Sequence, residues 1–266
     1  MGFVKTAAEI ARIEAVLANP RFGGAEMLSV EFLVDPEFVA RVLPPPLEPV
    51  AEPRMRAMIG RWQSNCVGDF AGGTVYVTCA HEGVEGEYNV AQYMDADAPT
   101  IFGRDVFGEP KKMARATLRA RGDAMRGTIE RGGVALVRLE AKLDRDNGPF
   151  EATRESYNIK SRPAADGHGL EEDAILTRAH YEIVARVSRE GEGRIALAGT
   201  VHDPLDEIPI REVLRATYFE GDLSAAVEVA ARIPADAFAP FHHGRNDDWS
   251  RLASAVGEAD EVAEAR

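Results

Sequence analysis

The sequence has few cysteines and none of the short motifs that bind metals or nucleotides. Cys66 and Cys79 are the only cysteines among 266 residues, and they lack the C-x-x-C spacing of a zinc or redox site. The six histidines form no H-E-x-x-H motif, and neither G-x-G-x-x-G nor G-x-x-x-x-G-K-[ST] occurs. We therefore expect no metal, no nucleotide and no other cofactor, and we expect both thiols to be reduced core groups.

Long apolar runs are also missing. No stretch of about 18 apolar residues is present to span a membrane. Glu9 and Glu14 interrupt the apolar residues of the N-terminal segment, which therefore does not resemble a signal peptide. A cytoplasmic protein with no membrane partner is the expectation.

Positive charge is in deficit as well. The formal net charge is −13, and the basic residues are scattered among acidic ones. A surface that neutralises phosphates needs clustered Lys and Arg. We therefore do not expect nucleic acid as a partner.

Alternating apolar residues predict that most of the chain forms antiparallel strands. They are expected near residues 28–34, 54–62, 73–81, 87–94, 114–121, 124–131, 133–143, 152–160, 176–188, 194–201 and 211–220. Short turns containing Gly, Asp or Asn, such as the one at 190–193, join many of these strands, which is typical of meanders that curl or close.

Three helices are predicted, over 6–18, 35–42 and 223–231. Thr6 and Glu9 have capping-box spacing at the start of the first. We expect a mainly antiparallel β fold of the α+β class that forms one domain over residues 1–243, followed by an acidic tail over 244–266.

Lysine is the rarest of the basic residues, and its distribution is uneven. Only five of the 31 basic residues are lysines, and two of these, Lys111 and Lys112, are adjacent. Lysine can lose its proton in a protein, whereas arginine cannot. The doublet therefore suggests amine chemistry, although a solvated pair on a loop is the simpler interpretation of the doublet alone.

The residues around the doublet favour the chemical interpretation. Only a neutral amine attacks a carbonyl, and both burial and a neighbouring cation disfavour the charged form. Lys112 and Arg104 carry such cations near Lys111, and Pro110 restricts the backbone before it. Glu109 is a candidate proton carrier, or alternatively an ion-pair partner of Arg104.

These motifs resemble a known family. Gly103-Arg104-Asp105 followed by Pro110-Lys111-Lys112 resembles the signature of the acetoacetate decarboxylase superfamily. Residues 39–48, 82–88, 157–160 and 203–212 resemble four further family segments in the right order.

The resemblance implies a fold and a chemistry. The implied fold is a closed antiparallel β-cone or barrel around a buried pocket, with a few peripheral helices, and the implied assembly is a homo-oligomer. The first lysine of the Pro-Lys-Lys run, Lys111, would form a Schiff base with the substrate. Activation of this lysine by another cation is a known feature of acetoacetate decarboxylase, which would give Lys112 the role of tuning the pKa of the amine.

The sequence departs from true acetoacetate decarboxylases at polar positions. The family's early arginine falls on Ala25, one of its two glutamates falls near Ala57, and Glu109 stands where an aromatic residue is common. These losses argue against acetoacetate decarboxylation but leave imine chemistry in place. Superfamily members without the decarboxylase residues are known as pyruvate aldolase-dehydratases.

We therefore predict a Schiff-base lyase that acts on a small 2-oxo acid. It would catalyse aldol condensation and dehydration, or hydration of an unsaturated 2-oxo acid. Lys111 would be the nucleophile and Glu109 the acid/base. The expected substrate-binding residues are Arg104, Glu87, Tyr88 and Gln92. Two alternatives stay open: a decarboxylase of acetoacetate or another β-keto acid, and a non-catalytic barrel that binds a small carboxylate.

Overall fold

The computed structural model describes residues 2–252 and consists mainly of strands. Seven strands form a closed ring: β1 (Arg21–Leu33), β3 (Arg54–Ser64), β4 (Gly68–His81), β5 (Val84–Met94), β10 (Phe150–Lys160), β11 (Ala174–Leu197) and β14 (Glu212–Ile233). Their order is β10-β5-β4-β3-β1-β14-β11, and β11 pairs back with β10. Every neighbouring pair in the ring is antiparallel except β10 and β5. The expected closed antiparallel β architecture with a few helices is thus confirmed.

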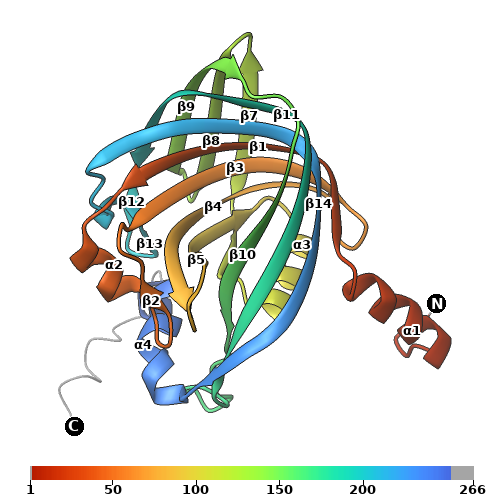
Figure 1. Cartoon of the computed structure of the whole chain (residues 1–266). Coiled ribbons are helices and arrows are strands. Elements are labelled where there is room, and N and C mark those ends of the chain that lie inside the picture. The colour runs from red at the N-terminus through yellow and green to blue at the C-terminus, as the bar shows by residue number, and fades with distance from the viewer. Residues whose placement is uncertain (1, 253–266) are drawn as a thin grey trace.

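A three-stranded extension continues the sheet beyond the ring. Its strands are β9 (Val134–Asp146), β8 (Ala124–Arg131) and β7 (Arg115–Arg121), and β9 joins it to β11. The short strands are β2 (Glu48–Pro49), β6 (Lys111–Met113), β12 (Gly199–Thr200) and β13 (Asp203–Pro204). The long strands β11 and β14 arch along one side of the ring, and β11 carries the extension at one end (Figure 1).

The strands of the ring have two differently used faces because side chains alternate along a strand. On β3, Met55, Ala57 and Ile59 belong to the main apolar core. Met58 and Trp62 point to the opposite face and join a smaller apolar cluster. This second face lines the interior of the ring, where a cavity remains.

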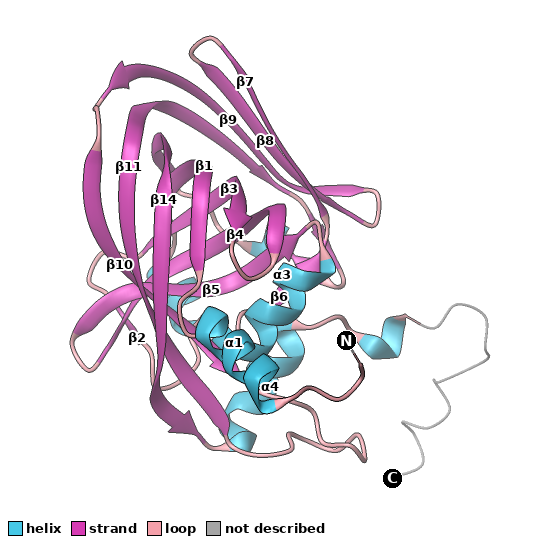
Figure 2. Ribbon diagram, turned by 90° about the vertical axis from the view of Figure 1, so that its right-hand side faces the viewer, coloured by secondary structure: helices cyan, strands magenta, loops and turns pink. Residues whose placement is uncertain are grey.

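The helices lie at the periphery (Figure 2). They are α1 (Ala7–Leu17), α2 (Pro36–Val42), α3 (Asp97–Phe102) and α4 (Ala235–Arg245), with short 3-10 turns at Leu205–Glu207 and Trp249–Arg251. The predicted capping box of α1 is present, with Thr6 and Glu9 each accepting from the other's backbone N–H. None of the helices within residues 2–252 is both long and apolar enough to cross a membrane.

The helix predicted over 223–231 is wrong, because these residues continue β14. Leu223 and Ala225 pair with Ile183 and Tyr181 of β11. The segment is rich in alanine, which favours a helix, but a long antiparallel pairing with β11 overrides this local preference.

The turn expected at 190–193 is also wrong, since β11 runs through it without reversing. Gly191 lies at a register shift between β11 and β9, and a Cβ there would come within 1.9 Å of the Lys142 carbonyl oxygen. The glycine therefore permits close approach of two backbones at a bulge. Glycine marks turns and bulges alike, so the pattern alone did not distinguish them.

The chain does not become irregular at residue 244, where the tail was expected to begin. Helix α4 continues to Arg245, and a 3-10 turn follows. The rest of the acidic segment, from residue 253, lies outside the described residues.

Candidate active site

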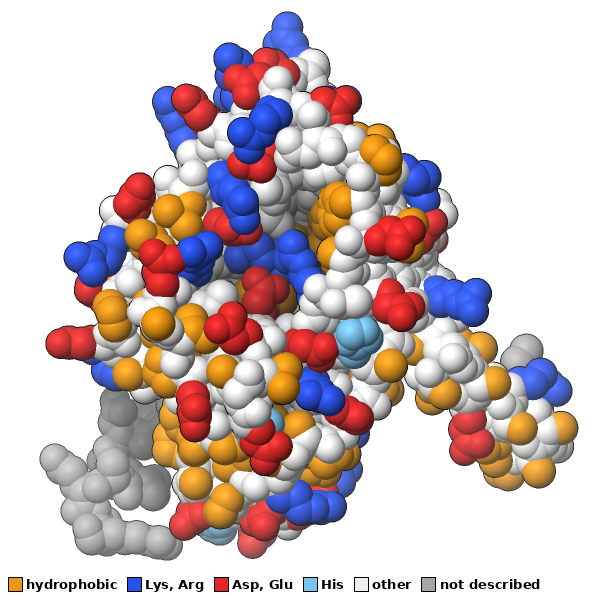
Figure 3. Space-filling view, in the orientation of Figure 1, with side chains coloured by type: hydrophobic (Ala, Val, Ile, Leu, Met, Phe, Trp, Pro, Cys, Tyr) orange, Lys and Arg blue, Asp and Glu red, His pale blue; other side chains and the backbone are white. Residues whose placement is uncertain are grey.

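A cavity of about 90 Å³ lies inside the ring, and all seven ring strands contribute to its wall. Its apolar lining consists of Phe22, Met27, Met58, Trp62, Phe70, Met94, Ile183, Phe219 and Leu223. Its polar lining consists of Arg56, Tyr76, Glu87, Asn89, Gln92, Glu109, Lys111, Arg154, Glu155, Ser156 and Tyr181. The space-filling view shows a hollow at the centre of this face, with basic and acidic side chains inside it (Figure 3).

Lys111 and Glu109 enter this cavity together. Lys111 is 7% exposed and Glu109 is 6% exposed. The Nζ atom of Lys111 lies 2.7 Å from Oε2 of Glu109, and the amide of Gln92 donates to the other carboxylate oxygen at 3.3 Å. The pair is therefore an amine and a proton-accepting group in direct contact, largely shielded from bulk water.

The loop before Lys111 explains how the pair is held. A π-helical turn (Gly103–Phe107) is closed by Gly108, whose φ is 81°, a conformation that favours glycine. The backbone N–H of Glu109 then donates to the carbonyl of Gly103 at 3.0 Å. A Cβ on Gly103 would lie 2.2 Å from Oε2 of Glu109 and 2.5 Å from Nζ of Lys111. The Gly-Arg-Asp motif thus supplies the space that the two side chains occupy.

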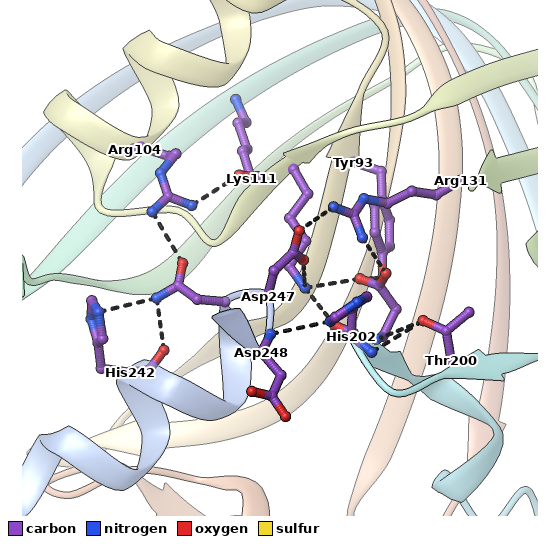
Figure 4. A network of polar contacts seen from close by, with 12 residues as sticks. Tyr93, Arg104, Lys111, Arg131, Thr200, His202, His242, Asp247 and Asp248 are labelled. Carbon is purple, nitrogen blue, oxygen red and sulfur yellow. Dashed lines mark hydrogen bonds and ion pairs between the residues drawn. The ribbon is translucent and has the colours of Figure 1, made fainter. Parts of the chain in front are cut away.

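Strand β6 then sends the two lysines to opposite sides. Lys111 and Lys112 pair with Gln92 and Tyr93 at the edge of β5, and alternation points only Lys111 into the ring. The Lys112 ammonium lies 3.0 Å from a carboxylate oxygen of each of Asp203 and Asp247, and it donates to the His202 carbonyl. In the close view, the Lys111 side chain points away from this network (Figure 4).

The sequence predicted that the Lys112 ammonium would lie beside the Lys111 amine. The structure instead places the two amines on opposite sides of the strand. Arg131 completes the network by contacting both Asp203 and Asp247, so two cations face two carboxylates. Asp203 and Asp247 therefore neutralise the charge of Lys112, and both acids are distant from Lys112 in the sequence.

Arg104 also lies outside the cavity. Its Nη1 donates to the backbone carbonyl of Lys111 at 3.0 Å, and its Nη2 donates to the side chain of Asn246 at 3.1 Å. Arg104 thus contacts the lysine segment from behind, without forming an ion pair with Glu109. The predicted role as a carboxylate ligand has no support in this arrangement.

Two of the three candidates on β5 face the cavity. Glu87 and Gln92 line it, whereas Tyr88 points to the opposite side. Strict alternation would separate positions 87 and 92, but Val90 is an extra residue between the Tyr76–Asn89 and Val75–Ala91 pairs. This bulge shifts the phase of β5 and directs both side chains inward.

The cavity contains two arginines that the sequence reasoning missed. Arg56 forms a bidentate pair with Glu87, with one contact at 2.8 Å and the other at 2.5 Å. Burial opposes the charge on Glu87, but the Arg56 guanidinium outweighs burial and holds the pKa of Glu87 below its ordinary value. Arg154 approaches Glu87 only to 4.0 Å.

The repulsion between these arginines shows how close they are. The charge of Arg56 is the main cause of a lowered pKa at Arg154. Glu155, another acid in the wall, already contacts His180 at 2.6 Å and Arg178 at 3.8 Å. Arg56 and Arg154 therefore share the Glu87 carboxylate, and Arg154 has the longer contact with it.

One of the missed residues left a signal in the sequence. Arg56 is a charged residue inside the apolar run 55–62, at the strand phase of Met58 and Trp62. Arg154 left no such signal, because polar residues surround it in the sequence of β10. Which face of β10 points into the ring depends on the pairing of β10 with β11.

Comparisons with known proteins agree with this architecture. The family model described as acetoacetate decarboxylase (ADC) matches residues 8–233. The chain belongs to the acetoacetate decarboxylase family.

Curated relatives within the family are distant. An acetoacetate decarboxylase of Streptomyces nogalater is 29% identical over 210 residues, which cover 77% of this chain and 85% of the relative. Acetoacetate decarboxylase 1 of Bradyrhizobium diazoefficiens is also 29% identical, with 77% and 83% covered.

Solved structures share the fold at lower identity. Acetoacetate decarboxylase from Legionella pneumophila superposes with a TM-score of 0.74 at 23% identity, covering 80% of this chain and 87% of the other. The enduracididine biosynthesis enzyme MppR, complexed with pyruvate, superposes with a TM-score of 0.68 at 17% identity, covering 79% and 90%. The family and the fold are therefore shown.

Proposed function

We propose that this family member forms a Schiff base between Lys111 and a small 2-oxo acid and acts as a lyase. The observation that carries the proposal is the 2.7 Å contact between the Lys111 amine and the Glu109 carboxylate, both of them buried in the wall of the ring cavity. A carboxylate at this distance is placed to accept the ammonium proton and leave a neutral amine.

The cations of the cavity favour a substrate that carries a carboxylate. Arg56 contacts Glu87 at 2.5 Å and Lys111 contacts Glu109 at 2.7 Å, whereas Arg154 approaches Glu87 only to 4.0 Å. Arg154 is therefore the cavity cation with the weakest partner, and a substrate carboxylate would bind there.

The size of the cavity favours a small substrate. Its volume of about 90 Å³ is smaller than that of a cavity of about 150 Å³ that is known to hold one benzene molecule. A keto acid of a few carbon atoms is therefore the class that fits.

The steps of the reaction need one amine and one acid/base. The neutral Lys111 amine adds to the keto carbon, and the carbonyl oxygen leaves as water after protonation from Glu109. The iminium then loses a proton from the adjacent carbon to Glu109 and becomes an enamine. The enamine carbon attacks an aldehyde, the resulting hydroxyl leaves as water, and hydrolysis of the imine releases an unsaturated 2-oxo acid and restores Lys111.

The position of the arginines favours this chemistry over loss of carbon dioxide. Arg56, Tyr76 and Asn89 are cross-strand neighbours on β3, β4 and β5. Met58, Thr74 and Gln92 form the parallel row two residues away along β3 and β4, and Gln92 pairs with Lys111. The two rows are therefore about 6.6 Å apart along these strands. A carboxylate held by guanidinium groups is stabilised in the ground state, and that stabilisation is lost as carbon dioxide forms. Decarboxylation of a β-keto acid remains the alternative that the family relatives support.

We also infer that the protein assembles with copies of itself. Helix α1 buries no residue within the described chain, and Ile10, Ile13, Val16 and Leu17 are exposed on it. The helix projects away from the ring (Figure 1). An isolated helix of 11 residues is marginal in water, so a second copy is the proposed cover. Multi-angle light scattering should give a mass above one chain.

Proton exchange distinguishes the two reactions. Pyruvate in D₂O should lose its methyl proton signal in the presence of the protein, because the enamine forms reversibly, and the Lys111→Gln variant should not catalyse this loss. Acetoacetate should release carbon dioxide more slowly than pyruvate exchanges. Rapid carbon dioxide release without exchange would favour the decarboxylase.

A further inference from the structure

A second cavity lies on the opposite side of the segment that carries Lys111. Its volume is about 230 Å³, larger than that of the first cavity. Pro110 and Lys112 line it, whereas Glu109 and Lys111 line the first cavity. Residues 109–112 are thus a wall with one cavity on each face.

The second cavity is mainly apolar. Its apolar side chains come from α2, β5, the 205–208 turn and α4: Phe38, Val42, Val90, Ala91, Leu205, Ile208, Pro240 and Phe241. Its charged and titratable side chains are Arg41, Lys112, His202, Asp203, Glu207 and Arg245. A ligand that fits would combine an apolar body with at least one polar end.

Arg245 is a cation of this cavity that has no acidic partner among the residues that the structure describes. Within residues 2–252 no carboxylate lies within ion-pair distance of its guanidinium. Its hydrogen bonds go to the carbonyl of Gly108 at 3.2 Å and to the hydroxyl of Ser161 at 3.1 Å. Burial lowers the pKa of Arg245 to about 10, and the nearby Arg104 adds to this effect. The group is still charged at neutral pH.

The other charges of the cavity are already compensated or lie at its rim. Lys112 and Arg131 share Asp203 and Asp247, so that network is neutral. Arg41 and Glu207 are both exposed and of opposite sign. Within residues 2–252, one positive charge away from the rim therefore remains without an acid, on Arg245, although the chain as a whole carries −13.

We propose that this second cavity binds a monocarboxylate with a short apolar chain, the carboxylate on Arg245 and the chain between α2, α4 and β5. A carboxylate accepts two parallel N–H bonds from a guanidinium, and Arg245 and Tyr88 both line this cavity. The bound molecule would lie against Pro110 and Lys112, behind the amine-bearing residue. This site is independent of the chemistry proposed at Lys111.

Calorimetric titration with sodium hexanoate tests the site. Hexanoate should bind the full chain at one site. Both n-hexanol and inorganic phosphate should bind at least tenfold more weakly, since n-hexanol lacks the carboxylate and phosphate lacks the apolar chain. Arg245→Gln should weaken hexanoate binding at least tenfold. Arg154→Gln is the matched control, because it removes an arginine from the first cavity, and it should change hexanoate binding by less than twofold.

A second variant guards against loss of folding in Arg245→Gln. Gly244 lines the same cavity, and a Cβ on it would meet nothing within 4 Å, so Gly244→Leu should fold and obstruct the site. It should also weaken hexanoate binding at least tenfold. Unchanged binding in both variants, or weakened binding in Arg154→Gln, would overturn the proposal. Neither result depends on whether Lys111 forms an imine.

Discussion

Glu109 and Lys111 stand two residues apart and meet at 2.7 Å on the same side of the chain. Pro110 between them faces the second cavity, as does Lys112. The extended backbone thus brings an acid and an amine together and sends the adjacent lysine away. The contact gives the chain one short route for moving a proton to and from the amine that we propose as the nucleophile.

Replacing Glu109 with glutamine should lower kcat by about 10² to 10⁴, the usual contribution of a positioned acid/base. Glutamine keeps the shape and can still contact Gln92, but it cannot accept the proton. Steady-state kinetics on pyruvate and an aldehyde would measure the loss. Glu155→Gln is the matched control, because Glu155 lines the same cavity and is held by His180; an equal loss in both variants would contradict the role of Glu109.

Replacing Arg154 with glutamine should raise KM for the keto acid roughly tenfold to a hundredfold, since hydrogen bonds to charged groups contribute about 1.5–3 kcal/mol. The thermal midpoint should change little, because the Arg154 side chain is 42% exposed. Arg56→Gln is the contrasting variant: it leaves the buried Glu87 without its main partner and should destabilise the fold by about 3–5 kcal/mol. A KM unchanged in Arg154→Gln would remove Arg154 from the substrate site.

Replacing Lys112 with glutamine should destabilise the protein while leaving imine formation at Lys111 possible. The change leaves Arg131 as the one cation that contacts Asp203 and Asp247 within the described residues, and breaking such a pair costs about 3–5 kcal/mol. Urea unfolding would measure it, with exposed Lys142→Gln as the control. If Lys112→Gln were fully stable but failed to form the imine, Lys112 would be the tuning residue that its sequence position suggested.

Stability should fall as the pH drops from about 6.5 to about 4, in part because of His242. Burial lowers the pKa of His242 to about 4 from its ordinary 6.5, and the Arg245 charge contributes. The unfolded chain therefore binds this proton at a higher pH than the folded chain does, so protonation favours unfolding below about 6.5 and the effect is complete near 4. The difference corresponds to about 3 kcal/mol.

Urea unfolding at several pH values tests this prediction. His242→Gln should flatten the fall in unfolding free energy between these limits. The neighbouring His243 is exposed, and His243→Gln should leave the pH dependence as in the original protein. Identical slopes for His242→Gln and the original chain would contradict the assignment.

The sequence was sufficient to predict much of the fold because local patterns and tertiary pairing agree over most of the chain. The alternating run 54–62 and the capping box at Thr6 are examples, and both are confirmed. The prediction failed at 223–231, where alanine-rich residues pair with a distant strand. Local preference cannot anticipate a partner 40 residues away.

The candidate site also contains residues that the local sequence predicts and residues that distant partners place. Lys111 and Glu109 were identifiable from a compact motif, and their contact depends only on the geometry of a short segment. The places of Lys112 and Arg104 depend on Asp203, Asn246 and Asp247, which are distant in sequence. The inward direction of both Glu87 and Gln92 depends on a bulge at Val90, which no pattern in β5 announces.

Covalent trapping measures directly whether Lys111 forms an imine with a keto acid. The protein is incubated with pyruvate, reduced with sodium borohydride, digested and analysed by mass spectrometry. We expect a reduced pyruvate adduct on the peptide that carries Lys111, with none on Lys112, Lys142 or Lys160. An adduct confined to another lysine, or no adduct from any small keto acid, would contradict it.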